Sequence, residues 1–476
     1  MADLDFLISE FQESALPALT PREIELPRVS RKATVVIGVR RAGKTFLLYQ
    51  EIRRLLESGI DRRDVLYANF EDDRIHPATP DLLARLLETF YRVNPAARRR
   101  TAYLFLDEIQ MVPGWPRFVR RVLDTENVRV YLTGSSAKML HADVATELRG
   151  RGLAVEVFPF SFSESNAAAG LEPPATMPPG PKLRSEIERR LLTYLDVGGF
   201  PEVQTMALVE RVQTLQDYVE IVLLRDVVER HRIENTLAAR AFARALLQSP
   251  ARRFTVNKIH ADLRSRGLQV SKDTLHALLQ HFQDAYLLFT APIFSKSVRA
   301  RATNPRKVYV IDPGLAWAMS HVTAVDTGAR LENVVFLQLR REHGRLLQGE
   351  IAYYLTASGR EVDFVVGDLF EQRAGRLVQA CTTLADPATR AREVVALTEA
   401  MAETGVTRAE VVTLHEEETI DTDEGAIRVV PAWRWLLEGR SRKAGTGSPV
   451  LRVRVKGKPP RRRRTGAESF LRVERL

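Results

Sequence analysis

The chain has 476 residues, of which 45% are hydrophobic and 27% are charged, and this length allows three or four domains of ordinary size. The single cysteine, Cys381, excludes an intramolecular disulfide and favours a reducing compartment. The first residues lack the basic and apolar regions of a signal peptide, and no long uncharged apolar stretch occurs. We therefore expect a cytoplasmic protein that makes no use of a membrane.

The net charge of +10 comes from one end of the chain. Residues 440–476 hold 13 Lys or Arg and two acids, which leaves residues 1–439 with 57 basic and 58 acidic side chains. The sequence predicts a disordered basic tail over residues 438–476, which can meet DNA phosphates without sequence preference. A solvated extension without a ligand is the alternative.

An N-terminal segment, residues 1–30, precedes a region in which short apolar runs alternate with helical patterns. The runs 34–37, 65–70, 103–107 and 128–133 predict strands. A helix after the first run places Phe46, Leu47, Ile52, Leu55 and Leu56 on one side. Strands separated by helices predict an α/β fold with a parallel sheet covered on both faces, over residues 31–165.

The strongest motif is a complete phosphate-loop pattern between the first predicted strand and its helix. Glycines allow the backbone amides to face phosphate, and the helix N-terminus adds partial positive charge. Lys44 is expected to reach the β and γ phosphates of ATP, and Thr45 to hold Mg²⁺. The predicted nucleotide contacts are Gly38, Val39, Arg40, Arg41, Ala42, Gly43, Lys44, Thr45 and Phe46.

A second motif follows at the end of the strand 103–107, where Asp107 and Glu108 are adjacent. Successive side chains at a strand end point in different directions, so Asp107 can lie near Mg²⁺ while Glu108 addresses the attacking water. This arrangement favours ATP hydrolysis over nucleotide binding alone. A strand that ends in a polar turn is the alternative.

Two further groups of residues suit the same chemistry. Ser135, with Thr133 behind it, follows the strand 128–133 and can bond the γ phosphate or the water, although these residues could equally cap a helix. Arg149 and Arg151 flank Gly150, and a guanidinium from a neighbouring subunit can stabilise charge on a transferring phosphoryl group. Ordinary surface arginines are the alternative to these catalytic arginines.

These motifs together resemble a family of bacterial and archaeal AAA-type ATPases that have a C-terminal domain shaped like a restriction endonuclease, domain of unknown function 4143. The resemblance covers roughly residues 15–437 and implies an ATPase core, a helical lid, a winged helix and a nuclease-like module. Further motifs that carry it are Phe158-Pro-Phe-Ser-Phe162, Gly198-Gly-Phe-Pro201, Leu224-Arg-Asp-Val227, Val310-Ile-Asp-Pro-Gly314, Glu332-Asn-Val-Val335 and Arg360-Glu-Val-Asp-Phe364.

The helical lid is expected over residues 166–247. Its predicted buried positions are Leu191, Leu195, Val212, Leu215, Val222, Leu223 and Val227. Arg225 is a candidate second sensor of the nucleotide, and a salt bridge to Asp226 or Glu229 is the alternative.

A winged helix is expected over residues 248–320. A helix that Ser271 caps leaves Lys272, His276 and Gln280 facing outward, which is the geometry of a helix-turn-helix. Predicted wing strands at 285–294 and 307–311 flank Lys296, Arg299, Arg301, Arg306 and Lys307, which could contact DNA phosphates. Packing between subunits is the alternative role of such a module.

The nuclease-like module is expected over residues 321–437. Glu332 lies on an apolar helix, and Glu361 and Asp363 project from one face of a strand. A restriction-type site also needs a strand with Glu-x-Lys, and Gln379 and Cys381 stand in those places. Gln379 adds no negative charge and Cys381 no positive charge, so we expect a degenerate module without nuclease activity.

Two hypotheses from different classes follow. The first is a Mg²⁺-dependent ATPase that acts as a homo-oligomeric ring and binds or remodels DNA, with branched or forked duplex as a candidate substrate. The second is a nucleotide-controlled switch or scaffold whose C-terminal modules bind protein. Glu108, Arg149 and Arg151 favour the first, whereas the nearly neutral charge of residues 1–439 is the main argument against strong DNA binding.

Overall fold

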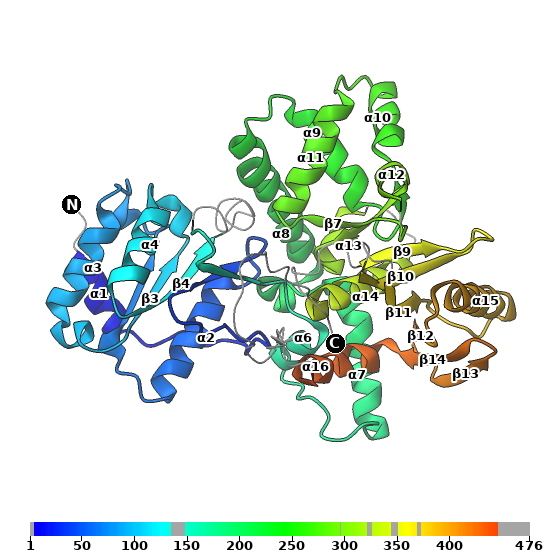
Figure 1. The fold of residues 1–476 in the computed structure, drawn as a ribbon, viewed down its shortest axis with the longest axis horizontal. Helices are drawn as coiled ribbons and strands as arrows, with labels where there is room; N and C mark the ends of the chain where they lie inside the picture. The colour runs from blue at the N-terminus through cyan, green and yellow to red at the C-terminus, as the bar shows by residue number, and fades with distance from the viewer. Residues whose placement is uncertain are drawn as a thin grey trace, which may run out of the picture.

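The computed structural model describes residues 4–134, 148–295, 297–320, 326–343, 351–368 and 373–445. Figure 1 shows an N-terminal lobe in blue and cyan, a helical middle part in green, and a C-terminal sheet in yellow and orange. None of the helices in these ranges is long and apolar enough to cross a membrane.

The N-terminal lobe is built on a five-stranded sheet in the order β2-β3-β4-β1-β5, and every pair of neighbours is parallel. The parallel α/β sheet that the sequence predicted is therefore confirmed. All side chains of β1 are buried, as expected of a central strand covered on both faces. The strands are β1 Ala33–Ile37, β2 Val65–Asn69, β3 Ala102–Asp107, β4 Val128–Gly134 and β5 Gly152–Glu156.

Helices α1 to α4 pack around this sheet. Of the α2 residues predicted to lie on one side, Leu47, Ile52 and Leu55 are buried and Leu56 is half-buried, whereas Phe46 is 47% exposed. Phe46 lies in the first turn of α2, and its ring meets that of Tyr49 edge-on, with ring centres 6.3 Å apart. The helices are α1 Leu4–Glu13, α2 Lys44–Glu57, α3 Leu82–Val93 and α4 Trp115–Thr125, with the short turns η1 Arg62–Asp64, η2 Asp73–Ile75, η3 Pro95–Arg98 and η4 Ile109–Met111.

A helical group follows the sheet. The predicted core positions of this group are buried, apart from the half-buried Val212. Helix α8 continues directly into η7, which has the wider turns of a π-helix, a feature that often marks functional positions. The elements are α6 Phe162–Ala168, α7 Pro181–Val197, η6 Pro201–Thr205, α8 Leu208–Ile221, η7 Val222–Glu229 and α9 Thr236–Leu247.

A small three-stranded antiparallel sheet, in the order β6-β8-β7, comes next with helices α10 to α13. Ser271 caps α11 through the Thr274 amide, and Lys272, His276 and Gln280 are exposed as predicted. The connection from β7 to β8 contains a helix, α12, that the predicted wing did not include. The elements are β6 Arg253–Phe254, α10 Val256–Ser265, α11 Lys272–Asp284, β7 Leu288–Ala291, α12 Val298–Thr303, β8 Arg306–Val310 and α13 Pro313–Met319.

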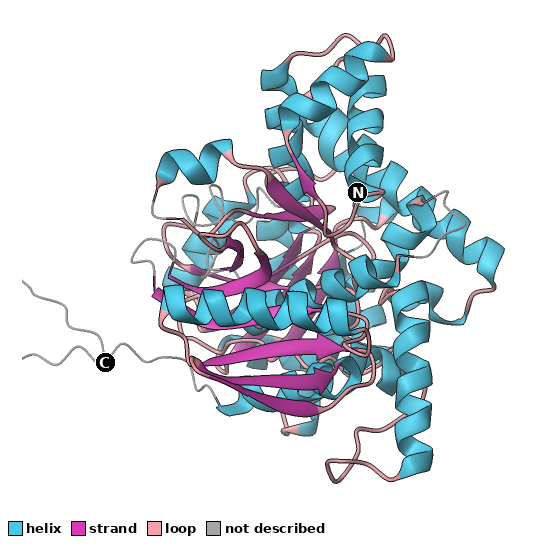
Figure 2. Ribbon diagram, turned by 90° about the vertical axis from the view of Figure 1, so that its right-hand side faces the viewer, coloured by secondary structure: helices cyan, strands magenta, loops and turns pink. Residues whose placement is uncertain are grey.

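The C-terminal part is a mixed six-stranded sheet in the order β13-β14-β12-β11-β10-β9. Figure 2 shows a long helix, α15, across one face, whereas α14 and α16 contact each other and the opposite face. The elements are α14 Thr327–His343, β9 Ile351–Leu355, β10 Glu361–Asp368, β11 Arg373–Ala380, α15 Pro387–Thr404, β12 Arg408–Thr413, β13 Glu418–Thr422, β14 Gly425–Pro431 and α16 Ala432–Gly445.

Two of the motifs that the sequence singled out contact each other. The buried Asp312 carboxylate accepts hydrogen bonds from the amides of Gly199, at 2.6 Å, and Leu315, at 3.0 Å. Gly198 has φ +77°, and a Cβ there would lie 2.0 Å from the Asp312 carboxylate. The turn at Gly198-Gly-Phe-Pro201 is therefore fitted to the Asp312 loop, and this contact joins the helical group to β8.

Candidate functional site

The predicted phosphate loop connects the end of β1 to the start of α2. Gly38 has φ +151°, and a Cβ there would lie 2.0 Å from the Val157 carbonyl, so no larger residue fits. Gly43 has φ +91° and directly precedes Lys44, the first residue of α2. The loop backbone thus curls over a helix N-terminus, which is the geometry of an anion site.

Lys44 lies inside this loop. Its side chain is 5% exposed, and Nζ lies 3.2 Å from the carbonyl oxygens of both Gly38 and Val39. Burial lowers the pKa of Lys44, whereas the negative charges of Glu108 and Asp107 oppose that change. A phosphate group in the loop would compensate the buried ammonium better than two neutral carbonyls do.

Asp107 ends β3 beside this loop and is almost completely buried. Its carboxylate accepts a hydrogen bond from the Tyr67 hydroxyl at 3.1 Å and one from the Thr133 hydroxyl, and Thr45 also bonds it. Burial raises the pKa of Asp107, against these hydrogen bonds. The structure therefore brings Thr45 and Asp107 together, and their hard oxygen atoms fit a Mg²⁺ ion.

Glu108 follows in an unfavourable backbone conformation, with φ 53°. Its amide donates to the Thr133 hydroxyl at 2.8 Å, and Oε2 accepts from the Gln110 amide group at 2.5 Å. A strained non-glycine residue persists only where the surroundings hold it, and such residues cluster at functional sites. Thr133 positions both acids at once, because its hydroxyl accepts from the Glu108 amide and donates to the Asp107 carboxylate.

Ser135, the residue that the sequence favoured for contact with the γ phosphate, lies outside the described residues.

The two loop arginines contact the helical group. Arg40 binds both carboxylate oxygens of Asp226 on η7, at 2.9 and 3.1 Å. Arg41 makes a longer contact of 3.5 Å to Glu202, and both of those side chains are exposed. Arg225 pairs with Glu229 on the surface, so the structure favours the salt bridge over a role as second sensor. Asp226 was missed as a partner of the loop.

Arg22 is a second residue that sequence reasoning missed. This buried side chain donates to the carbonyls of Ala42, at 2.7 Å, and Phe158, at 2.6 Å, and to the Glu164 carboxylate at 3.0 Å. Glu164 in turn closes a capping box with Ser161 at the start of α6. Nothing in the sequence indicated that Arg22 fixes the phosphate loop, because Glu164 and Phe158 lie 142 and 136 residues further along the chain.

Arg149 and Arg151 lie just before β5, at the amino-terminal edge of the sheet. Because β5 pairs with β1 in parallel from Gly152 opposite Ala33, they are one strand length, about 16 Å, from the phosphate loop of their own chain. Arg151 pairs with Asp124 at 2.5 Å, whereas Arg149 is exposed. Neither arginine can reach a phosphate in its own loop.

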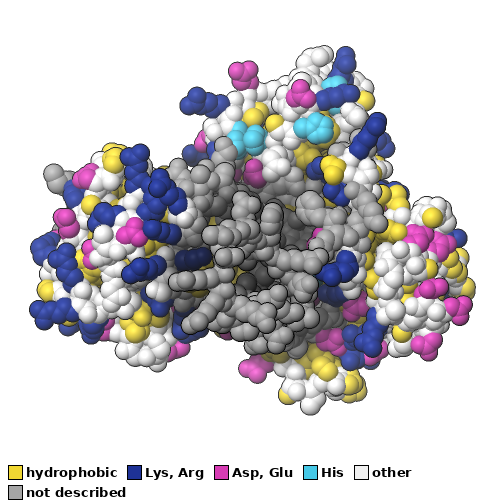
Figure 3. All heavy atoms as spheres, viewed as in Figure 1, with side chains coloured by type: hydrophobic (Ala, Val, Ile, Leu, Met, Phe, Trp, Pro, Cys, Tyr) yellow, Lys and Arg dark blue, Asp and Glu magenta, His cyan; other side chains and the backbone are white. Residues whose placement is uncertain are grey.

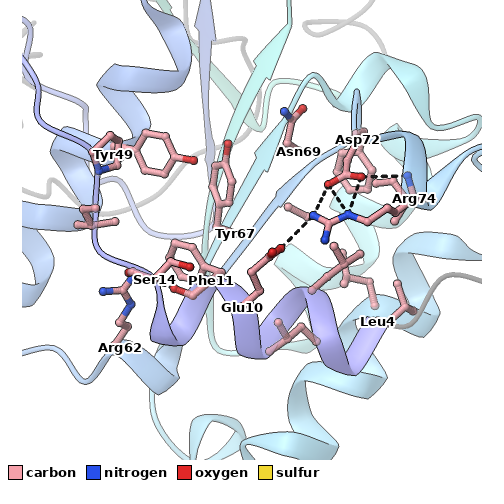
Figure 4. Close-up of a pocket in the computed structure, with 18 of the residues that line it drawn as sticks. Leu4, Glu10, Phe11, Ser14, Tyr49, Arg62, Tyr67, Asn69, Asp72 and Arg74 are labelled. Carbon is pink, nitrogen blue, oxygen red and sulfur yellow. Dashed lines mark hydrogen bonds and ion pairs between the residues drawn. The ribbon is translucent and has the colours of Figure 1, made fainter.

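A cavity of about 300 Å³ lies beneath α1, against β2 and α3 (Figure 4). Phe11, Tyr49 and Tyr67 give it an aromatic wall, with ring centres of Tyr67 at 5.4 Å from Phe11 and 5.0 Å from Tyr49. Arg74, bound to Asp72 and Glu10, lies at its rim. Since Tyr67 also bonds Asp107, this cavity adjoins the back of the site. Sequence reasoning missed it because α1 lay outside the predicted core.

The basic residues proposed for DNA contact come from three elements and differ in exposure. Lys272 is exposed on α11, Arg301 donates to the Ser295 carbonyl at 2.5 Å, and Arg306 is half-buried in β8. Arg299 is exposed on α12, and Lys296 lies outside the described residues. Figure 3 shows Lys and Arg side chains on the N-terminal lobe and around α10.

Lys307 corrects one expectation outright. The sequence grouped it with the phosphate contacts of the wing, but its side chain is buried and its ammonium binds Glu332, Glu361 and Asp363. The reason is alternation along β8, which turns Lys307 toward the C-terminal sheet.

Family models match two parts of the chain. Residues 30–166 match an AAA domain, and residues 188–326 match a domain of unknown function, DUF8612. The chain is 33% identical over 430 residues to the uncharacterized protein MJ1544 of Methanocaldococcus jannaschii, with 87% of this chain and 90% of that protein covered. The chain belongs to the family of MJ1544. The N-terminal lobe is an ATP-binding, AAA-type P-loop ATPase domain, as the sequence predicted.

Other similarities are more distant. An uncharacterized protein of Haemophilus influenzae is 26% identical over 331 residues, which cover 70% of this chain and 78% of that protein. Among solved structures, the Aeropyrum pernix Orc1 protein in complex with DNA shares 16% identity over 60% of this chain and 86% of that chain, with a TM-score of 0.26. AMPPCP-bound DnaA from Aquifex aeolicus shares 13% identity over 58% of this chain and 86% of that chain, with a TM-score of 0.23. These two structural similarities are too low to support an inference.

Proposed function

We propose that the AAA domain hydrolyses ATP in a Mg²⁺-dependent reaction. Lys44 contacts the β and γ phosphates, and Thr45 and Asp107 hold Mg²⁺, which would neutralise charge on the phosphates. Glu108 orients and deprotonates the attacking water. The observation that carries this proposal is the placement of Glu108 in a strained conformation beside Asp107, fixed by Thr133 and Gln110.

We further propose that the active form is a ring in which Arg149 or Arg151 completes the site of a neighbouring subunit. Support comes from their position at the sheet edge opposite the phosphate loop, which prevents action within one chain. Arg149 is the better candidate, because Asp124 already pairs with Arg151. Ser135 remains a proposed contact to the γ phosphate.

The domain boundaries predicted from the sequence remain proposals, as do the winged helix at 248–320 and the degenerate nuclease-like module at 321–437. Helices α9, α10 and α11 beside the β6-β8-β7 sheet support the first. The order of helix α14 and strands β9 to β11, with Glu332, Glu361 and Asp363 converging, supports the second.

DNA is the proposed partner, contacted by Lys272, Arg299, Arg301 and Arg306 and by the basic tail. The exposed face of α11, with Lys272, His276 and Gln280, supports this proposal. The second candidate is a nucleotide-controlled scaffold, and the burial of Lys307 favours it because one of the basic side chains predicted to meet DNA is occupied inside the protein.

ATPase rates of the full chain with no DNA, single-stranded DNA, duplex and a four-way junction test the function. DNA should stimulate the ATPase rate of the wild type, and Lys272→Glu should abolish that stimulation. Lys258→Glu changes a matched exposed lysine on α10 and should keep it. This pair of results supports a DNA-dependent ATPase. Mg²⁺-dependent hydrolysis that no DNA changes favours the scaffold. Absence of any hydrolysis, with nucleotide bound, contradicts the enzyme.

A further inference from the structure

The cluster of Lys307, Glu332, Glu361 and Asp363, here called the Lys307 cluster, lies between the small sheet and the C-terminal sheet. Lys307 comes from β8, Glu332 from α14, and the other two acids from β10. The Lys307 Nζ atom lies 2.7 Å from one carboxylate oxygen of each acid. These three acids are the ones that a restriction-type site would use, in the module that the sequence predicted to be degenerate.

The geometry suits an ammonium group as the cation. An ammonium has three N–H donors, and the three carboxylates supply one acceptor for each. Only 2% of Lys307 is exposed, and a buried charge is stable only when it is paired. The Lys307 side chain therefore has every partner that it needs at this position.

The remaining carboxylate contacts hold the acids toward Lys307. The second oxygen of Asp363 accepts from the Ala380 amide at 3.0 Å, and that of Glu361 pairs with Arg253 at 3.0 Å. The Tyr309 hydroxyl donates to Glu332 at 2.9 Å, on the oxygen that also binds Lys307. A metal at this position would have to displace Lys307 and compete with a second cation, Arg253.

Gln379, which stands where a nuclease would have an acid, has a different role. Its oxygen accepts from the Asp363 amide at 3.0 Å, and its amide group donates to Glu393 at 2.7 Å. Gln379 thus orients the strand that carries Asp363. The Cys381 thiol donates to the Thr383 carbonyl at 3.0 Å, so the position expected for a nuclease lysine is also used internally.

The Lys307 cluster is part of a continuous junction. Tyr353 of β9 exchanges backbone hydrogen bonds with Pro292 and Phe294, just after β7, at 3.0 and 2.7 Å. The ring of Tyr309 stacks on that of Phe336 of α14, with centres 4.0 Å apart. Displacement of Lys307 would therefore disturb the contact between the two sheets.

We propose that the Lys307 ammonium is the built-in cation of this carboxylate site. The C-terminal domain then needs no metal ion at these acids in order to fold. Lys307 fixes this domain to the small sheet. The residues present do not fit the Mg²⁺ site that a nuclease-like fold implies. This proposal goes beyond the proposed ATPase and does not depend on it.

Mn²⁺ titration of the full chain, followed by electron paramagnetic resonance without nucleotide, tests the proposal. We expect no Mn²⁺ bound at the cluster in the wild type. Lys307→Met should gain one Mn²⁺ site, with an affinity roughly tenfold or more above any residual Mn²⁺ binding by the wild-type chain, since three carboxylates are typical hard ligands for such an ion. Adding Asp363→Asn to Lys307→Met should abolish that site.

Arg376→Met is the matched control. Arg376 is another cation between carboxylates of the same domain, Glu342 at 2.9 Å and Glu410 at 2.7 Å, but it lacks a third acid. We expect no Mn²⁺ gain there, and an equal gain would overturn the specific role of Lys307. Two other results would overturn the proposal. One is a Mn²⁺ site in the wild type that Asp363→Asn removes, and the other is a Lys307→Met protein that folds but binds no additional Mn²⁺.

Lys307→Met could fail to fold, because three acids lose their cation. Lys307→Met with both Glu332→Gln and Asp363→Asn removes the excess negative charge while the side-chain sizes stay similar. We expect circular dichroism to show that this triple variant folds. A triple variant as unfolded as the single one would contradict the charge role.

Discussion

Arg40 of the phosphate loop and Asp226 of η7 form a two-pronged ion pair, with nitrogen-to-oxygen distances of 2.9 and 3.1 Å. Although burial opposes its charge, Asp226 raises the pKa of Arg40. Asp226 also lies close enough to Lys44 to affect its pKa. The Asp226 carboxylate of η7 thus compensates the two basic side chains of the phosphate loop.

Asp226→Asn should tighten ATP binding about three- to tenfold, because it removes a negative charge facing both Arg40 and the phosphates. Glu202→Gln is the control, since the Arg41–Glu202 pair is longer and exposed and should contribute little. Titration calorimetry of both variants with ATP and Mg²⁺ checks this. Weaker binding by Asp226→Asn would mean that the pair instead holds Arg40 in the orientation that phosphate needs.

Glu108→Gln should lower the hydrolysis rate about a hundredfold or more while ATP still binds, because the amide cannot accept a proton from water. Lys44→Ala should abolish both binding and hydrolysis, because its ammonium no longer meets the phosphates. Phosphate release and nucleotide affinity, measured side by side, separate the two effects. Turnover at the wild-type rate in Glu108→Gln would sink its assignment as the base.

The sheet and the phosphate loop were predictable because their signals are local. Apolar runs, glycine spacing and the acids after the strand at 107 all lie within a few residues of what they determine. The pairs Arg40–Asp226 and Arg22–Glu164 were not, since 186 and 142 residues separate the partners. Lys307 shows the same limit, because its charge was visible but the acids that surround it come from two later elements.

Mixing Lys44→Ala protein with protein that carries Arg149→Ala and Arg151→Ala should restore part of the ATPase activity. A mixed interface can pair an intact phosphate loop with an intact arginine, which each inactive parent lacks. The measurement is phosphate release against mixing ratio. No recovery, in subunits shown by mass photometry to mix, would argue against action between subunits.

Asp312 predicts a defined pH dependence of stability. Burial raises its pKa from 3.8 to about 6, despite the amides of Gly199 and Leu315. The folded state then binds a proton that the unfolded state releases, so unfolding free energy from this group falls as pH rises from about 4 to about 6. The difference in urea midpoint between the wild type and Asp312→Asn should shrink over that interval. A difference independent of pH would mean that Asp312 stays ionised when folded.

DNA affinity should divide into two contributions that mutation and salt can separate. Deleting residues 440–476 should remove the part of the DNA affinity that does not depend on DNA sequence. The affinity of the shortened chain should then depend less steeply on salt concentration. For duplex DNA, the slope of log K against log salt decreases by roughly 0.9 for every phosphate that the shortened chain no longer neutralises. Fluorescence anisotropy with labelled duplex and four-way DNA, at several salt concentrations, measures both quantities.

The binding that remains after the deletion should depend on the shape of the DNA and on the folded body. Removing the charges of Arg299, Arg301 and Arg306 should weaken this remaining binding, because these side chains would contact DNA phosphates next to the groove that α11 enters. Lys307 is left unchanged in this variant, since its ammonium is committed to the C-terminal acids and its removal would disturb the fold. If deletion abolishes all binding and the three arginine changes do nothing, the folded body does not read DNA. The second hypothesis, in which the C-terminal modules bind protein, then becomes the better explanation.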